Sequence, residues 1–354
     1  MFVMLLLAAL AIPLLSGCDV GGTSSNTSNT SDCSKAANIS PNTVAGGVAL
    51  NSRLVAQAGR PDSHLVAQQM VQPAAQNKPT VFVSSKNFTE EYIIGEMYAL
   101  ALENAGIKVD RSKMNLGATD IAQAAIVKGD ISLYPEYTGT SLGVVLKVDL
   151  TSSPDWKDAA KVYAKVKDEY EKQFKLTVLT PAPMNDTQAI AMPKDKASAN
   201  NIKTLCDLSV KAPSLTLIST AEFDNRSDGL PGLQKAYGGF QFKKVVDVDN
   251  SIKYDALKQG QGDAVIAYST EGAIAANNLL VLDDNKHFYP PYPVAPVVRD
   301  DIIAAYPNIP DLLNAVDAKI TNDEITKLNA DVDINKKDYK QVAKDWMKAQ
   351  GLIK

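Results

Sequence analysis

Apolar and polar residues alternate along the chain in blocks whose character changes near residue 78. The first 17 residues form an apolar run without a charged side chain, and a Ser-, Thr-, Asn-, Ala- and Gln-rich tract without a sustained period follows it. Beyond residue 78, short β-prone runs alternate with segments whose apolar residues recur at helical spacing. The pattern predicts an export signal, a flexible tether and a folded α/β part.

The folded part is predicted to begin with a strand at 81–83, a helix at 90–104, a helix at 119–128 and a strand at 131–134. The pattern then restarts with a charged helix at 156–174, strands at 176–179, 189–192, 215–219, 244–248 and 264–268, and a largely helical tail at 300–350. This βαβ rhythm predicts mainly parallel, twisted sheets.

The rhythm falls into two α/β lobes. We expect a signal peptide at 1–17, a lipidated cysteine with a disordered tether at 18–78, lobe 1 at 79–182 and 291–354, and lobe 2 at 183–290. Such sheets bind ligands at the carboxyl ends of their strands, and a cleft between two lobes can close by a hinge motion. The expected fold class is therefore a two-lobed α/β structure with a ligand cleft between the lobes.

The end of the apolar run carries the signal for the compartment. Leu15-Ser16-Gly17-Cys18 resembles the lipobox of bacterial lipoproteins, so the mature protein is expected to begin at a lipidated Cys18 on the outer, periplasmic face of the cytoplasmic membrane. The alternative is an ordinary secretory signal or membrane anchor, and the missing Lys or Arg before the run departs from the usual pattern. Because Cys33 lies in the tether, no disulfide with Cys206 is expected.

Composition excludes several function classes. With 36 basic against 40 acidic residues the net charge is −4, which argues against a nucleic-acid partner. Two histidines and three cysteines give no basis for a metal centre. The folded part has one histidine, no Gly-x-Ser-x-Gly turn and no nucleotide-binding loop, so neither an enzyme nor a cofactor is expected.

Five ordered motifs carry a family resemblance that covers essentially residues 78–354. They are Ser84-Ser85-Lys86-Asn87-Phe88-Thr89-Glu90, Tyr134-Pro135-Glu136-Tyr137-Thr138-Gly139-Thr140, Asn185-Asp186-Thr187-Gln188-Ala189, Ala267-Tyr268-Ser269-Thr270-Glu271-Gly272 and Pro290-Pro291-Tyr292. Together they resemble the osmoprotectant-binding proteins of ABC importers for glycine betaine, choline and related quaternary amines. The resemblance implies a periplasmic-binding-protein fold of type II-like form, without enzymatic activity.

The resemblance also implies the ligand site. A quaternary ammonium has no N–H to donate, so aromatic faces hold it, and Tyr137, Tyr268 and Tyr292 are the expected cage. Lys86 and Arg226, with the Thr140 hydroxyl, are expected to hold a ligand carboxylate. The alternative for Arg226 is a surface ion pair with Asp224 or Asp228, and for a single tyrosine an ordinary half-buried position.

One motif departs from the family pattern. Many members read Asn-Asp-Thr-Tyr-Ala where this chain has Asp186 and Gln188, so an amide replaces a fourth cage tyrosine. Both residues are counted with the ligand site, and carnitine or ergothioneine become alternatives to glycine betaine and choline. Glu136 and Asp186 as an acid–base pair is the weaker interpretation.

The expected partners are the small solute, an ABC permease with its ATPase subunit, and the membrane through the lipid. The protein is expected to act as a monomer. A tethered structural or adhesion lipoprotein is the competing function, and it predicts no stabilisation by a small molecule.

Overall fold

The computed structural model describes residues 78–354. The predicted signal peptide at 1–17, the lipidation site at Cys18, Cys33 and nearly all of the tether lie outside the described residues. Within the described part, no helix is both long enough and apolar enough to cross a membrane.

Lobe 1 is built around a three-stranded sheet in the order β3-β10-β4. Its strands are β3 (Leu133–Tyr137), β10 (Val294–Arg299) and β4 (Leu176–Val178), and β10 runs antiparallel to both neighbours. A parallel pair, β1 (Val81–Phe82) with β2 (Val109–Asp110), lies beside β3, because Val83, directly after β1, forms a parallel bridge with Leu133. The side chains of Val81, Val83, Leu133 and Val297 are fully buried, so the core of lobe 1 runs through these strands.

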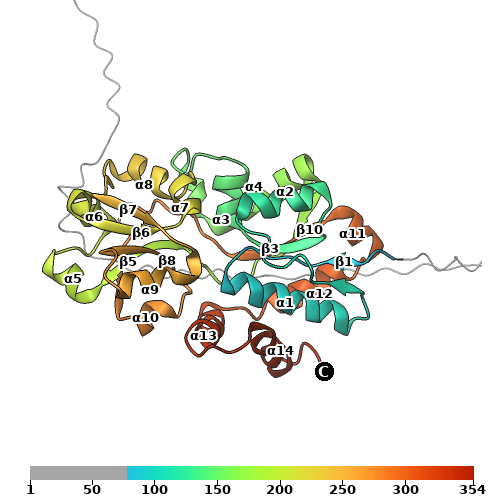
Figure 1. Cartoon of the computed structure of the whole chain (residues 1–354). Helices are drawn as coiled ribbons and strands as arrows, with labels where there is room; N and C mark the ends of the chain where they lie inside the picture. The colour runs from blue at the N-terminus through green and yellow to red at the C-terminus, as the bar shows by residue number, and fades with distance from the viewer. Residues whose placement is uncertain (1–77) are drawn as a thin grey trace, which may run out of the picture. The chain divides into compact units, whose positions relative to one another are not determined.

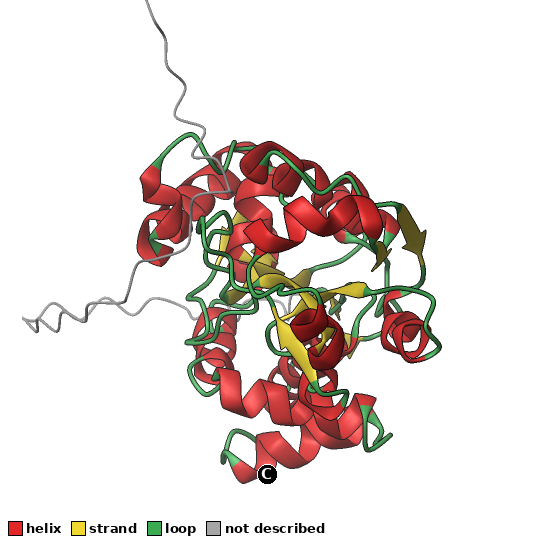
Figure 2. Ribbon diagram, turned by 90° about the vertical axis from the view of Figure 1, so that its left-hand side faces the viewer, coloured by secondary structure: helices red, strands yellow, loops and turns green. Residues whose placement is uncertain are grey.

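Lobe 2 is built around a five-stranded sheet in the order β7-β6-β8-β5-β9. Its strands are β5 (Gln188–Pro193), β6 (Thr216–Ser219), β7 (Lys244–Asp247), β8 (Ala264–Tyr268) and β9 (Leu279–Val281). β6 is parallel to β7 and β8, whereas β5 is antiparallel to β8 and β9. In Figure 2 most strands lie in the interior with helices around them.

The three-stranded sheet of lobe 1 is antiparallel and the sheet of lobe 2 is mixed, so the expectation of mainly parallel sheets is wrong. The antiparallel strands β5 and β10 are the two strands that the chain enters directly from the other lobe. Parallel pairing needs a crossover that returns the chain to the same end of the sheet, whereas a strand arriving from the other lobe starts at the opposite end. Hydrophobic periodicity indicates a strand but carries no information on its direction.

The helices cover both sheets. In lobe 1 they are α1 (Thr89–Asn104), α2 (Thr119–Lys128), the short α3 (Thr138–Thr140) with a π-helical turn at Ser141–Val145, α4 (Ala159–Phe174), α11 (Asp300–Ala305), α12 (Ile309–Asp317), α13 (Asn322–Asp333) and α14 (Tyr339–Ala349). In lobe 2 they are α5 (Lys194–Ala199), α6 (Leu205–Lys211), α7 (Ala221–Asn225), α8 (Leu230–Tyr237), α9 (Lys253–Lys258) and α10 (Ala273–Ala276). Single 3₁₀ turns occur at Pro154–Lys157, Ala212–Ser214 and Asn250–Ile252.

Local sequence explains where the main helices begin and end. Asp158 caps α4 by accepting hydrogen bonds from the backbone of the first turn, so the helix predicted at 156–174 begins three residues late, after a 3₁₀ turn. α2 ends at Gly129, whose φ of 90° suits glycine. α1 buries the apolar stripe that includes Ile93 and Met97, and it packs against α12, α13 and α14 (Figure 1).

The chain crosses from one lobe to the other twice, from β4 to β5 and back from β9 to β10. The two crossing segments are hydrogen-bonded to each other where the Asp186 amide donates to the Tyr292 carbonyl, at 3.2 Å. The predicted lobe boundaries at 182/183 and 290/291 fall in these segments and stay predictions.

Cys206 lies buried on α6 and is disulfide-bonded. The expectation that it forms no bridge is therefore wrong. An exported chain meets an oxidising compartment, in which disulfides form and persist.

Candidate functional site

A small cavity of about 20 Å³ lies where the two lobes meet. It is lined by all eight predicted ligand-site residues and by three further ones: Lys86, Tyr137, Thr140, Asp186, Gln188, Arg226, Tyr268 and Tyr292, with Phe88, Thr119 and Glu222. The structure therefore brings together residues that are up to 206 positions apart, from Lys86 to Tyr292. Their roles toward a ligand stay predictions.

Several of the lining residues lie at strand ends or in the loops next to them, as expected for an α/β fold, and the others lie on or next to helices and in the crossing segments. Lys86 and Phe88 lie in the loop between β1 and α1, and Tyr137 ends β3. From lobe 2, Tyr268 ends β8 and pairs in register with Gln188 at the start of β5. Arg226 caps the C-terminus of α7, and Asp186 and Tyr292 lie in the two crossing segments.

Aromatic rings form one wall of the site. Phe88 stacks with Tyr137 at 6.2 Å between ring centroids and with Tyr268 at 6.1 Å, so it joins a ring of lobe 1 to a ring of lobe 2. Phe88 lies within the first of the five motifs, but the sequence alone indicates no role for it. Tyr292 is buried, and its hydroxyl donates to Asp228 Oδ2 at 2.8 Å.

Arg226 is bonded to protein carboxylates. Its Nε and Nη2 donate to the two oxygens of Asp228, each at 2.8 Å, and Nη1 donates to Glu222 at 3.1 Å. The ion pair between Arg226 and Asp228 is buried, with side-chain exposures of 9% and 0%, so the alternative of a surface ion pair is wrong for Asp228. Burial opposes the charge of Arg226, but the carboxylate of Asp228 outweighs it and raises the pKa of the guanidinium.

Asp228 also organises its neighbours. Gln188 Nε2 donates to Asp228 Oδ2 at 2.8 Å, while Gln188 Oε1 is buried without a hydrogen-bond partner among the described residues. Arg226 reaches lobe 1 through the Thr140 hydroxyl, at 3.1 Å. From the sequence, Asp228 is expected only as a surface partner of Arg226. The two residues are two positions apart, and this spacing does not indicate whether the pair is buried.

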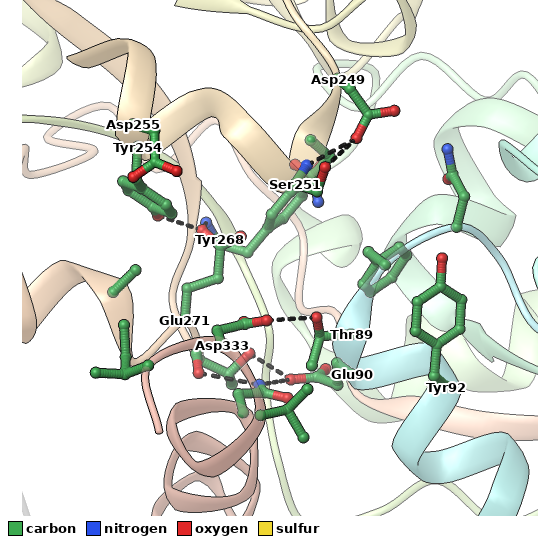
Figure 3. A pocket seen from close by; sticks show the side chains of 18 of the residues that line it. Thr89, Glu90, Tyr92, Asp249, Ser251, Tyr254, Asp255, Tyr268, Glu271 and Asp333 are labelled. Atoms are coloured by element: carbon green, nitrogen blue, oxygen red, sulfur yellow. Dashed lines mark hydrogen bonds between the residues drawn. The ribbon is translucent and has the colours of Figure 1, made fainter. Parts of the chain in front are cut away.

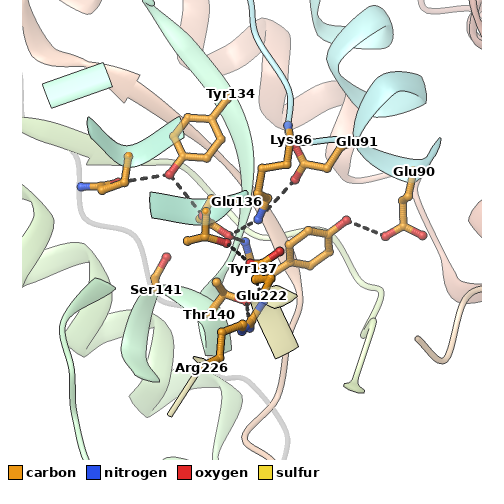
Figure 4. A network of polar contacts seen from close by, with 12 residues as sticks. Lys86, Glu90, Glu91, Tyr134, Glu136, Tyr137, Thr140, Ser141, Glu222 and Arg226 are labelled. Atoms are coloured by element: carbon orange, nitrogen blue, oxygen red, sulfur yellow. Dashed lines mark hydrogen bonds and ion pairs between the residues drawn. The ribbon is translucent and has the colours of Figure 1, made fainter. Parts of the chain in front are cut away.

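Lys86 is paired in the same way. Its ammonium lies 2.6 Å from Glu136 and 3.5 Å from Glu91, and 4.8 Å from the centroid of the Tyr137 ring (Figure 4). Burial opposes the charge of Lys86, but Glu136 and then Glu91 outweigh it and raise the pKa of the ammonium. Glu136 is the main partner, and burial raises the pKa of the more distant Glu91 to about 8.

A second polar cluster lies beside the aromatic wall. The Tyr137 hydroxyl donates to Glu90 Oε1 at 2.7 Å, and Asn329 Nδ2 donates to Glu90 Oε2 at 2.7 Å. The Thr270 hydroxyl lies 2.6 Å from Glu90 Oε2 and 2.8 Å from Asp186 Oδ1. Burial is the main cause that raises the pKa of both carboxyl groups. The motifs contained Glu90 and Thr270, but only the fold brings them together.

Larger cavities flank the site. One of about 650 Å³ shares Phe88, Asp186 and Tyr268 with the central cavity, and Figure 3 shows side chains of α1 facing those of the 3₁₀ turn and α9 across it. Another of about 890 Å³ shares Thr119, Glu222 and Arg226. Within residues 78–354, no group of three or more His, Cys, Asp or Glu side chains is arranged to hold a metal ion.

Comparisons with known proteins identify the family. A family model described as the substrate-binding domain of ABC-type glycine betaine transport systems matches residues 79–349. The glycine betaine-binding protein YehZ of Escherichia coli is 35% identical over 283 residues, 77% of this chain and 92% of that protein. The ergothioneine transport permease/ergothioneine binding protein EgtU of Helicobacter pylori is 33% identical over 279 residues, 79% of this chain but 49% of that protein, so the chain spans about half the length of this relative.

Solved structures agree with the predicted fold. Apo YehZ from Escherichia coli has a TM-score of 0.57 at 34% identity, and a glycine betaine/carnitine/choline ABC transporter structure has 0.61 at 30%. Each match covers 77% of this chain and 99% of the other. These likenesses confirm the two-lobed α/β fold of periplasmic binding proteins. The chain therefore belongs to the substrate-binding domains of ABC-type glycine betaine transport systems, a family of solute-binding proteins rather than of enzymes.

Proposed function

We propose that this protein captures a solute with a quaternary ammonium group and delivers it to the permease of an ABC importer. The observation that carries the proposal is the stacking of Phe88 with Tyr137 and Tyr268 at a cavity that Asp186 also lines. A cation covered by methyl groups cannot donate hydrogen bonds, so aromatic faces and a nearby carboxylate are the groups that stabilise it. Relatives of the chain are named as binding proteins for glycine betaine, carnitine or ergothioneine, which supports this class of ligand.

Capture requires the lobes to separate. A cavity of about 20 Å³ has room for roughly one water molecule, so a betaine-sized ligand cannot enter it as it stands. The lobes meet through hydrogen bonds that one hinge motion can break, including Thr119 to Glu222 at 3.0 Å and Ser227 to the Gly143 carbonyl at 2.7 Å. Closing around the solute brings the two lobes together again, with the lining side chains moved apart to make room for it, and presents one shape to the permease.

The compartment and partners follow from the same proposal. The protein works outside the cytoplasm as a monomer, anchored by lipid on Cys18, and its permease and ATPase subunits are separate chains. The anchor keeps the loaded protein close to the permease, which raises its effective concentration there.

The ion pairs of Arg226 and Lys86 bear on the identity of the solute. Arg226 and Lys86 each contact buried carboxylates, so holding a ligand carboxylate would require either side chain to exchange a partner. We therefore expect the ammonium group of the ligand, rather than a carboxylate, to provide most of the affinity. Gln188 acts through Asp228, so carnitine and ergothioneine stay alternatives to glycine betaine and choline.

A ligand screen by thermal unfolding tests the proposal. The purified protein is titrated with glycine betaine, proline betaine, choline, carnitine and ergothioneine, and hits are measured by calorimetry. A ligand at 100 times its dissociation constant adds about 2.7 kcal/mol to the free energy of unfolding. Turnover of a hit, or no shift with any of these solutes in a folded sample, would contradict the proposal.

A substitution in the aromatic wall locates the binding site. Tyr268→Ala is expected to weaken binding of the hit by roughly 2- to 30-fold, since one aromatic face contributes about 0.5–2 kcal/mol. Tyr163→Ala is the matched control, because Tyr163 is a half-buried tyrosine on α4 that lines none of the described cavities. Equal affinities of the two variants would remove Tyr268 from the site.

A further inference from the structure

One hydroxyl group lies between two buried carboxyl groups. Thr270 Oγ1 is 2.6 Å from Glu90 Oε2 and 2.8 Å from Asp186 Oδ1. A hydroxyl has a single hydrogen, so it can donate to only one of these oxygens. The other contact is a hydrogen bond only if that carboxyl group carries a proton and donates it to Thr270.

The remaining donors cannot supply this proton. Glu90 already accepts from the Tyr137 hydroxyl and from Asn329 Nδ2, each at 2.7 Å. Asp186 Oδ1 accepts the Thr270 backbone N–H at 3.1 Å. All these groups donate their hydrogens to the carboxyl groups. Besides the hydroxyl hydrogen of Thr270, the Glu90–Thr270–Asp186 chain therefore holds one proton on its two carboxyl groups, which leaves the pair with a single negative charge.

The surroundings favour this shared proton. Glu90 is 3% exposed and Asp186 5%, and among the described residues neither forms a salt bridge. Burial, followed for Asp186 by the charge of Glu90, raises the pKa of these carboxyl groups. The titratable groups that face the pair from other positions are Glu91, Tyr137, Tyr254, Tyr268 and Glu271, all acids.

The nearest lysines are engaged elsewhere. Lys86 bonds to Glu136, and Lys253 bonds to Glu271 at 2.7 Å. Glu90 and Asp186 therefore have no cation of their own. Asp186 nevertheless lines the central cavity of about 20 Å³ beside the aromatic rings, here called the aromatic cavity.

On the basis of the function proposed above, we propose that a quaternary ammonium entering the aromatic cavity displaces the proton shared by Glu90, Thr270 and Asp186. The carboxyl O–H bond breaks, the proton passes to solvent buffer, and the pair takes its second negative charge beside the bound cation. Glu90 and Thr270, which touch no ligand in this scheme, are positioning residues that set the proton content of Asp186.

The sign of the pH dependence follows. The free protein binds one proton more than the complex, so rising pH favours the complex. Affinity increases by up to tenfold per pH unit between the pKa of the pair in the complex and its pKa in the free protein, and it levels off outside that range.

Calorimetry in two buffers measures the released proton. Tetramethylammonium, choline and glycine betaine are titrated at one pH in phosphate and in Tris, whose ionisation enthalpies differ, and the difference in heat gives the number of protons released. The wild-type protein should release close to one proton per bound cation. Asp186→Asn and Glu90→Gln should release close to none and lose the pH dependence of binding. Asp311→Asn, an exposed acid on α12, should behave like the wild type.

The infrared spectrum of the free protein gives a readout that does not depend on a ligand. A protonated carboxyl band should be present at neutral pH. In the Glu90→Gln/Asp186→Asn double variant it should lose the contribution of one carboxyl group, while the contribution of Glu91, whose pKa burial raises to about 8, remains. Equal spectra would refute the shared proton. Binding with the same heat in both buffers would refute its release while leaving cation binding intact. No binding of any of the three cations, nor of carnitine or ergothioneine, would refute both the proposed function and the release.

Discussion

Removing the Arg226 guanidinium tests whether its contact with Asp228 is a buried ion pair. In Arg226→Ala the Asp228 carboxylate, which is fully buried, keeps only the neutral donors Gln188 and Tyr292. Breaking a buried pair from one side costs about 3–5 kcal/mol, because the remaining charge stays uncompensated in the interior. An exposed pair would cost about 1 kcal/mol or less.

Urea unfolding followed by circular dichroism measures this difference. Arg226→Ala should lower the free energy of unfolding by about 3–5 kcal/mol. The double variant Arg226→Ala/Asp228→Asn removes the stranded charge and should regain a large part of that loss. Lys172→Ala, which breaks the exposed pair with Asp168 on α4, is the control and should leave the midpoint almost unchanged.

Two results would refute the reasoning. A loss below about 1 kcal/mol in Arg226→Ala would mean that the pair behaves as an exposed contact. A double variant as unstable as the single one would mean that an uncompensated carboxylate is not the cause of the loss. In that case the bridge from Arg226 to Thr140 of lobe 1 would be the stronger explanation.

Two further predictions concern lobe 1. Because burial raises the pKa of Glu91 to about 8, the folded chain keeps a proton that the unfolded chain releases near pH 4.5. The free energy of unfolding should therefore fall by a few kcal/mol as the pH rises from about 5 to 8. Urea titrations at several pH values measure this dependence, and Glu91→Gln should flatten it. An unchanged slope in that variant would assign the dependence to other groups. A methyl group on Gly139 would lie 2.6 Å from the Tyr292 ring and 2.8 Å from the Pro291 carbonyl. Gly139→Ala should therefore lower the free energy of unfolding by roughly 1–3 kcal/mol and weaken ligand binding. Wild-type values for both would show that the segment around Pro291 and Tyr292 moves aside without cost.

Local signals predicted many elements well. The helix at 119–128 and the strand at 264–268 have the expected bounds, because a glycine ends the first and turn residues border the second. β10 was not predicted: it follows a proline-rich segment, contains Pro296, and is buried along nearly its whole length, so no alternation marks it. Strand direction depends on where the chain comes from, which a local pattern does not contain.

The motifs predicted which residues gather at the site but not how they bond to one another. Phe88 and Glu90 were inside a quoted motif, yet their partners Tyr268 and Thr270 are 180 residues further along the chain. Arg226 was expected to be available for a ligand, and whether an adjacent carboxylate is buried with it depends on both lobes. Charge pairing of this kind requires the tertiary structure.

The double passage of the chain between the lobes has a consequence for the order in which the protein can form. All five strands of the lobe 2 sheet lie in one stretch, 188–281. In the lobe 1 sheet, β10 is the central strand that pairs with both β3 and β4, and it is synthesised after that stretch. A growing chain can therefore complete the second lobe while the first still lacks its central strand. Strands β3 and β4 wait with unpaired edges through more than a hundred residues of synthesis, and a chain cut short before residue 294 would contain a finished lobe 2 beside a lobe 1 that cannot close its sheet.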